Sequence, residues 1–164
     1  MRAQGCPFLH LSLSVVGIPS NARWKQHGVT VAGGRGWGGA LHQLYRPHGL
    51  CVDDRDDTLF IADTLNHRIV AWKPGDKEGR LVAGGNGQGN RLDQLYAPTD
   101  VLLDQENRSL IICDCGNRRV MRWSLHSGTT QGHLLIDNIW CCKLAMNKEG
   151  DLYVSDTRKD EVRR

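Results

Sequence analysis

Short apolar segments alternate with polar turns along most of the chain, and no stretch keeps the period of an amphipathic helix. The clearest series is rich in apolar and β-branched residues, and its segments are residues 48–52, 58–62, 68–73 and 80–83. Polar turns separate these segments, beginning with the acidic run 53–57. We predict that the four segments are four short strands.

The same series recurs along the chain. At a shift of 51 residues, residues 28–73 align with residues 79–124 without a gap, and 19 of the 46 pairs are identical. A weaker third copy follows at a shift of 42, where residues 152–154 align with residues 110–112. A fixed period of this size indicates a repeat architecture. The third copy stops one residue before the Trp that the repeat predicts, so we interpret it as cut within a unit.

Four strands joined by short turns are typical of a propeller blade. We therefore predict an all-β fold, a partial β-propeller of four-stranded antiparallel blades that stays open within this chain. The expected parts are an N-terminal segment (1–23), an outer strand near Val29–Ala32 with a glycine-rich linker (24–47), a blade (48–84), a linker and blade (85–136) and a truncated blade (137–164). The repeated linkers account for a high glycine content, 19 of 164 residues.

The repeated blocks are similar to those of a known family. The first copy reads P-x-G-L-x-V-D at 47–53 and L-F-I-A-D-T-x-N-H-R-I-V at 59–70. The second reads P-x-D-V-x-L-D at 98–104 and L-I-I-C-D-x-G-N-R-R-V at 110–120. Both resemble the NHL repeat of β-propellers, and the resemblance covers roughly residues 24–164. It implies a ring with more blades than this chain holds.

One set of side chains recurs with the repeat, and its members are Asp63, Asn66, Arg68 and Trp72, then Asp114, Asn117, Arg119 and Trp123, then Asp156. A group that every unit needs is more typical of structure than of catalysis. We expect each Arg to bind its Asp through two hydrogen bonds, while Asn bonds the backbone of the turn between the second and third strands. We expect the two Trp residues to pack between neighbouring blades.

Some NHL-type propellers are enzymes, such as the peptide-amidating lyase, and related propellers act as lactonases. The resemblance implies that such a site would lie at the central channel, on the first strands of several blades. The matching positions in this chain are His48, Thr99 and Cys142. One His, one Thr and one Cys do not form a metal shell. We therefore predict no catalytic residue, no metal and no cofactor here.

The function that this pattern favours is binding. We predict a non-catalytic scaffold that presents loops and a central channel to a protein or peptide. Two alternatives stay open: part of a metal-dependent propeller enzyme of the lyase or lactonase type, and an RNA-binding propeller. The best RNA-binding candidates are Arg118, Arg119 and Arg122. Because unpaired edge strands promote association, we also expect self-association through the open edges of the propeller.

Composition leaves the cellular compartment undecided. The net charge of +3 is too small to indicate nucleic acid or membrane as a partner, and no long apolar run predicts a membrane span. Residues 8–18 alternate Leu with His and Ser, which favours an edge strand over a secretory signal. The six cysteines form no regular framework. We expect Cys51 and Cys113 to be small apolar core residues, with disulfides as the alternative.

Overall fold

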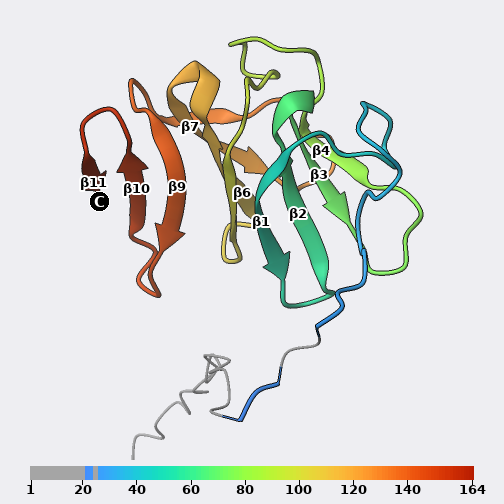
Figure 1. Ribbon diagram of the computed structural model, residues 1–164. Coiled ribbons are helices and arrows are strands. Elements are labelled where there is room, and N and C mark those ends of the chain that lie inside the picture. Colours follow the sequence, from blue (N-terminus) through green and yellow to red (C-terminus); the bar gives the residue numbers. More distant parts are fainter. Residues whose placement is uncertain (1–20, 24–25) are drawn as a thin grey trace, which may run out of the picture.

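The computed structural model describes residues 21–23 and 26–164, so the strand or signal expected at 8–18 lies outside the described residues. Three antiparallel sheets, which we call blades 1 to 3, follow one another in chain order (Figure 1). Blade 1 contains β1 (Pro47–Asp53), β2 (Thr58–Asp63), β3 (Arg68–Trp72) and β4 (Arg80–Gly84). Blade 2 contains β5 (Asp100–Asp104), β6 (Ser109–Asp114), β7 (Arg119–Ser124) and β8 (His133–Ile136). Blade 3 contains β9 (Cys141–Met146), β10 (Leu152–Asp156) and β11 (Glu161–Arg163).

The prediction of an open all-β propeller is confirmed. In each blade the strands pair in sequence order, and one turn of 3-10 helix, η1 (Thr64–Asn66) or η2 (Cys115–Asn117), joins the second and third strands of blades 1 and 2. Blades 1 and 3 lie on opposite sides of blade 2 in Figure 1. Within the described residues, no helix is long and apolar enough to cross a membrane.

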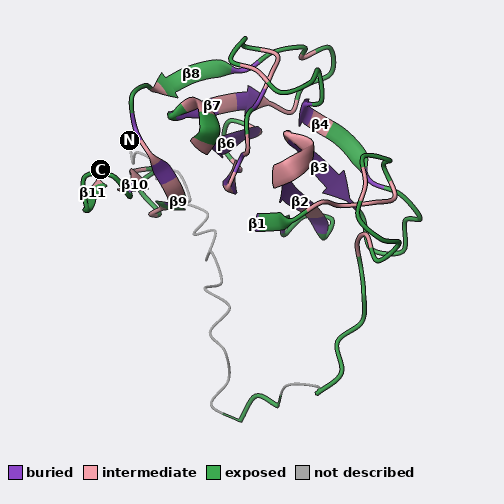
Figure 2. Ribbon diagram, turned by 45° about the horizontal axis from the view of Figure 1, so that its top comes forward, coloured by how far each residue is buried: buried purple, intermediate pink, exposed green. Residues whose placement is uncertain are grey.

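Stacking of the blades explains why the middle strands are apolar on both faces. Every residue of β3 and β6 is buried, and Figure 2 shows the buried positions gathered in the middle of the blades. One apolar cluster fills the boundary between blades 1 and 2 and includes Phe60, Ile69, Met121 and Trp123. A second fills the boundary between blades 2 and 3 and includes Ile111, Val120, Leu144 and Val154.

The two repeated Trp residues have different neighbours. Trp123 lies in the cluster between blades 1 and 2. Trp72 instead packs with Ile61 and Val70 on the other face of blade 1, where Ala32 and Leu44 cover it. Trp72 therefore contacts the preceding linker rather than a neighbouring blade.

The outer strand expected near Val29–Ala32 is the clearest error of the sequence analysis. The structure assigns no strand to residues 26–46. The repeat counterpart of this segment is β4, which is a strand because it pairs with β3. The segment has no such partner among the described strands, and Val29 is 84% and Val31 52% exposed. The segment has the sequence pattern of a strand, but no described strand offers it an edge with which to pair.

The recurring Asp–Asn–Arg set binds the linker that precedes its blade through hydrogen bonds, and we call this arrangement the clasp. Asp63 Oδ1 accepts the Tyr45 N–H at 2.7 Å, and its Oδ2 accepts hydrogen bonds from Asn66 Nδ2 and Arg68 Nε, each at 2.8 Å. The two Arg68 Nη groups donate to linker carbonyls, including that of Gly39 at 2.7 Å. The expected two-bond pairing of Arg with Asp is therefore wrong, because the remaining guanidinium N–H groups bind the linker.

Blade 2 repeats this clasp, and blade 3 lacks it. Asp114, Asn117 and Arg119 hold the linker of residues 85–99 through the same set of bonds. The connection before blade 3 is only residues 137–140, and Lys159 and Glu161 stand at the Asn and Arg positions. The Asp156 Oδ1 atom accepts the N–H of Arg158 in its own turn instead, at 3.2 Å.

An ion pair joins the first turns of blades 1 and 2. Asp53 accepts hydrogen bonds from Arg108 Nη1 at 2.7 Å and from Gln105 Nε2 at 3.1 Å. Burial by itself raises the pKa of Asp53, but these hydrogen bonds and that from the Arg55 N–H outweigh it and hold the pKa below its usual value near 3.8. The acidic run 53–57 therefore helps to join blades.

Candidate functional site

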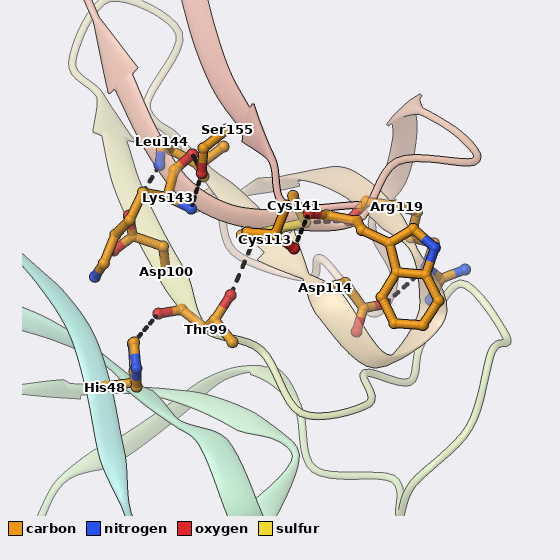
Figure 3. The surroundings of a disulfide bond; sticks show 12 residues. His48, Thr99, Asp100, Cys113, Asp114, Arg119, Cys141, Lys143, Leu144 and Ser155 are labelled. Atoms are coloured by element: carbon orange, nitrogen blue, oxygen red, sulfur yellow. Dashed lines mark hydrogen bonds and ion pairs between the residues drawn. A yellow bond between two sulfur atoms is a disulfide. The ribbon is translucent and has the colours of Figure 1, made fainter. Parts of the chain in front are cut away.

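The predicted channel positions lie on or beside neighbouring first strands: His48 on β1, Cys142 on β9, and Thr99 immediately before β5. His48 Nδ1 lies 3.1 Å from the carbonyl oxygen of Thr99 (Figure 3). In the tautomer that carries its proton on Nδ1, His48 donates a hydrogen bond to this oxygen. The Thr99 hydroxyl donates to Cys113 Sγ at 3.3 Å. Cys142 occupies the same place in β9 as His48 in β1, because both strands begin with a bulge in their pairing. The structure thus joins His48 to Thr99 directly and places Cys142 on the next strand.

A buried carboxylate that the sequence analysis missed lies between these strands. Asp100 is 7% exposed, and its Oδ2 accepts the Leu144 N–H at 2.9 Å (Figure 3). Its Oδ1 lies 3.5 Å from Lys143 Nζ. A Cβ at Gly49 would lie 2.7 Å from the Asp100 Cα, so blade 1 can approach only without a side chain there. The alignment of the repeats could have pointed to Asp100, because Gly49, Asp100 and Lys143 occupy equivalent positions in the first strands of the three blades.

Cys113 on β6 and Cys141 on β9 form a disulfide that joins blade 2 to blade 3 (Figure 3). Their Cα atoms are 5.7 Å apart, and both residues are fully buried. The expectation that Cys113 is a free core thiol is therefore wrong, although the residue does lie in the core. The free Cys51 packs beside the cluster between blades 1 and 2.

The half-buried free thiols of Cys51 and Cys115 are poor nucleophiles. Burial raises the pKa of Cys51 to about 12, and the carboxylates of Asp100 and Asp53 add to this effect. Burial also raises the pKa of Cys115, and the nearby Cys142 contributes. Since the thiolate is the reactive form, neither Cys51 nor Cys115 is activated for catalysis. The described residues also contain no group of three or more His, Cys, Asp or Glu side chains placed to hold a metal ion.

An aromatic ring lies beside two guanidinium groups in the loops at the boundary of blades 2 and 3. The ring centroid of Trp140 is 4.6 Å from Arg118 Cζ and 5.6 Å from Arg158 Cζ, within the range of cation–π attraction. The Trp140 carbonyl accepts hydrogen bonds from the Thr157 N–H at 3.0 Å and its hydroxyl at 3.2 Å. Trp140, Thr157 and Arg158 line an open hollow of about 430 Å³.

Sequence reasoning missed this site, which we call the Trp140 site and define as Trp140, Arg118, Thr157 and Arg158. The available signal was a Trp outside the repeated Trp position, in the connection 137–140 that replaces a glycine-rich linker. Among the described acidic side chains, none forms an ion pair with Arg118 or Arg158. The site therefore presents positive charge beside a half-buried indole.

The three arginines that we considered for RNA binding lie in three different surroundings. Arg119 is buried against Asp114, with Nε 2.7 Å from the carboxylate. Arg122 lies 3.5 Å from the carboxylate of Asp104. Arg118 lies over the Trp140 ring. Their side chains do not form a single basic patch.

Comparison with known proteins fits this architecture. The family model of the NHL repeat matches residues 44–72, from the end of the linker through β3. Residues 44–72 therefore match an NHL repeat, and the fold is that of an open β-propeller. No curated protein matches the chain. Among solved structures, a gluconolactonase from Xanthomonas campestris is similar to it, with a TM-score of 0.53 and 18% sequence identity. The match covers 70% of this chain and 36% of the gluconolactonase, and at this identity the likeness concerns the fold alone.

Proposed function

We propose that this NHL-repeat chain is a non-catalytic binding scaffold, and that the Trp140 site binds an acidic segment of a protein or peptide. The observation that carries the proposal is the indole of Trp140 beside two guanidinium groups with no described carboxylate partner. Trp and Arg are among the residues that most often dominate binding energy at protein interfaces. Guanidinium groups also pair with carboxylates through parallel hydrogen bonds, which favours Asp and Glu in the partner.

The inner strands support a scaffold over an enzyme of the lactonase type. His48 is bonded to the backbone of blade 2, and Asp100 is bonded to the backbone of blade 3. These polar groups join blades, and an enzyme would need further residues to bind and transform a substrate. The likeness to the gluconolactonase keeps an enzyme as the second candidate, since it concerns the same fold.

The proposal is tested by titrating the full chain with poly-L-glutamate and following bound polymer by fluorescence anisotropy. Replacing Trp140 by Ala should weaken binding about tenfold or more, since loss of a central aromatic anchor commonly costs that much. Trp37→Ala is the matched control, because this Trp is 75% exposed and belongs to the linker before blade 1. It should bind as the wild type does.

Two results would contradict this proposal. One is equal binding of poly-L-glutamate by the wild type and Trp140→Ala. The other is tighter binding of poly(U) than of poly-L-glutamate, with an affinity that falls steeply with salt, which would favour the RNA-binding alternative because phosphate contacts release counterions. Poly-L-lysine serves as the polymer control and should not bind.

A further inference from the structure

The Trp140 site is assembled from two blades. Arg118 lies just before β7 of blade 2, and Arg158 lies in the turn between β10 and β11 of blade 3. Both guanidinium groups lie close to the ring of Trp140, in the connection that joins the two blades. Because like charges repel each other, the two groups stay beside one ring only while the blades keep their relative position. The geometry of the site therefore depends on the links across this boundary.

The Cys113–Cys141 disulfide is a covalent link across this boundary, and it adjoins the site. Cys141 directly follows Trp140, and Cys113 belongs to β6 of blade 2 (Figure 3). On the other side of Trp140, the Ile139 N–H donates a hydrogen bond to the carbonyl oxygen of Arg118 at 2.9 Å. Trp140 is thus tied to blade 2 by a hydrogen bond on one side and by the disulfide on the other.

The boundary of blades 1 and 2 is joined in another way. Ala62 and Pro98 stand there at the positions of the two bonded cysteines, so no disulfide forms. The Asp53–Arg108 ion pair joins that boundary instead, and Gly150 stands at the Arg108 position in blade 3. The disulfide therefore occurs at the boundary that carries the Trp140 site and lacks this ion pair.

We propose that the Cys113–Cys141 disulfide is a redox switch for acidic ligands at the Trp140 site, with tight binding in the oxidised chain and weak binding in the reduced chain. This inference rests on the binding function proposed above. In the switching step a dithiol gives up two electrons and two protons and becomes a disulfide itself, while the S–S bond breaks and Cys113 and Cys141 become thiols. Without the cross-link, β9 is free to shift from β6, and the repulsion between Arg118 and Arg158 separates them.

The first test measures binding of poly-L-glutamate to the full chain by fluorescence anisotropy, before and after reduction with dithiothreitol. Reduction should weaken the affinity at least about fivefold, the lower end of typical coupling between two sites. The double variant Cys113→Ala, Cys141→Ala should bind weakly with or without dithiothreitol. Cys51→Ala is the matched control, because this thiol is free, and it should respond as the wild type does.

The outcomes of this test separate the switch from the function on which it rests. An oxidised chain that does not bind the polymer would overturn the proposed function and the switch together. An oxidised chain and a reduced chain that bind with equal affinity would overturn the switch alone.

Linkage provides a second test that keeps both cysteines. If oxidation strengthens binding of the polymer, bound polymer must favour the disulfide by the same factor. In a buffer of reduced and oxidised dithiothreitol, saturating poly-L-glutamate should shift the equilibrium at Cys113 and Cys141 at least about fivefold toward the disulfide. Alkylation followed by mass spectrometry reads these two residues separately from the free thiols. Trp140→Ala should abolish the shift, whereas Trp37→Ala should keep it.

Circular dichroism distinguishes a switch from loss of the fold. The reduced chain should keep the far-UV spectrum of the oxidised chain, because the strands of each blade pair through their backbones. A reduced chain without the sheet signal would overturn the proposal, since the disulfide would then hold the fold rather than the site. A disulfide equilibrium that bound polymer leaves unchanged would overturn it as well.

Discussion

The Cys113–Cys141 disulfide should contribute substantially to stability, and reduction is the perturbation that measures it. The two residues are 28 positions apart. A cross-link of that span removes loop-closure entropy from the unfolded chain worth about 3.5 kcal/mol at room temperature. For a protein of this size, a loss of that magnitude lowers the melting temperature by roughly 7–14 °C.

The loss should be concentrated in blade 3, because the boundary of blades 2 and 3 has few other links. The first turns of blades 1 and 2 are joined through Asp53 and Arg108, but Gly150 stands at the Arg108 position in blade 3. Blade 3 also lacks the clasp around a long linker. What remains includes the bond from the Leu144 N–H to Asp100 and the apolar cluster. Reduction should therefore loosen β9 and β10 before β2 and β3.

The assay is urea unfolding followed by Trp fluorescence, in the oxidised protein and with a phosphine reductant, combined with amide hydrogen exchange. The double variant Cys113→Ala, Cys141→Ala should show no response to the reductant, which separates the disulfide from the free thiols. The reasoning fails if reduction changes the free energy of unfolding by less than about 1 kcal/mol. It also fails if β2 and β9 lose exchange protection together.

Two further changes test the contacts between blades. Gly49→Ala should destabilise the chain by about 1–3 kcal/mol in urea unfolding, since its Cβ would press on the backbone of β5, whereas Gly28→Ala, with open space around it, should be neutral. Asp53→Asn should flatten the acid dependence of stability. The folded pKa of Asp53 is lowered, so its contribution is present above the usual value near 3.8 and is lost as the pH falls below it. Asp54→Asn is the exposed control and should keep the acid dependence of the wild type in melts between pH 3 and pH 6.

The blades could be predicted from the sequence because every level of the pattern agrees with the repeat. The apolar segments, the turn residues and the 51-residue shift all place strands at the same positions, and β1–β4 lie there. The outer strand at Val29–Ala32 satisfied the same pattern and is nevertheless not a strand. A strand is stable only when a neighbouring edge accepts its hydrogen bonds, and a local pattern does not report whether that edge exists.

The features of the candidate site lay beyond sequence reasoning for a different reason. The disulfide and the Trp140 site both depend on which side chains meet across the boundary of blades 2 and 3. Cys113 and Cys141 belong to different repeat positions, so the alignment of the copies gives no reason to pair them. The repeat predicts what the blades share, and these contacts arise where blade 3 departs from it.

Blade 3 keeps the Asp of the recurring Asp–Asn–Arg set but not its Asn or Arg, so it distinguishes the role of the Asp from that of the Arg. Where a long glycine-rich linker precedes the blade, Arg68 and Arg119 bind its carbonyls. Where the connection shortens to residues 137–140, Glu161 replaces the Arg and Asp156 remains, bonded within its own turn. The Arg is thus present only in the blades that a long linker precedes, which argues for a structural role rather than a catalytic one. The short connection, which no Asp–Asn–Arg set binds, is also the one that carries Trp140. The proposed binding site therefore lies where the fold no longer uses its repeated residues.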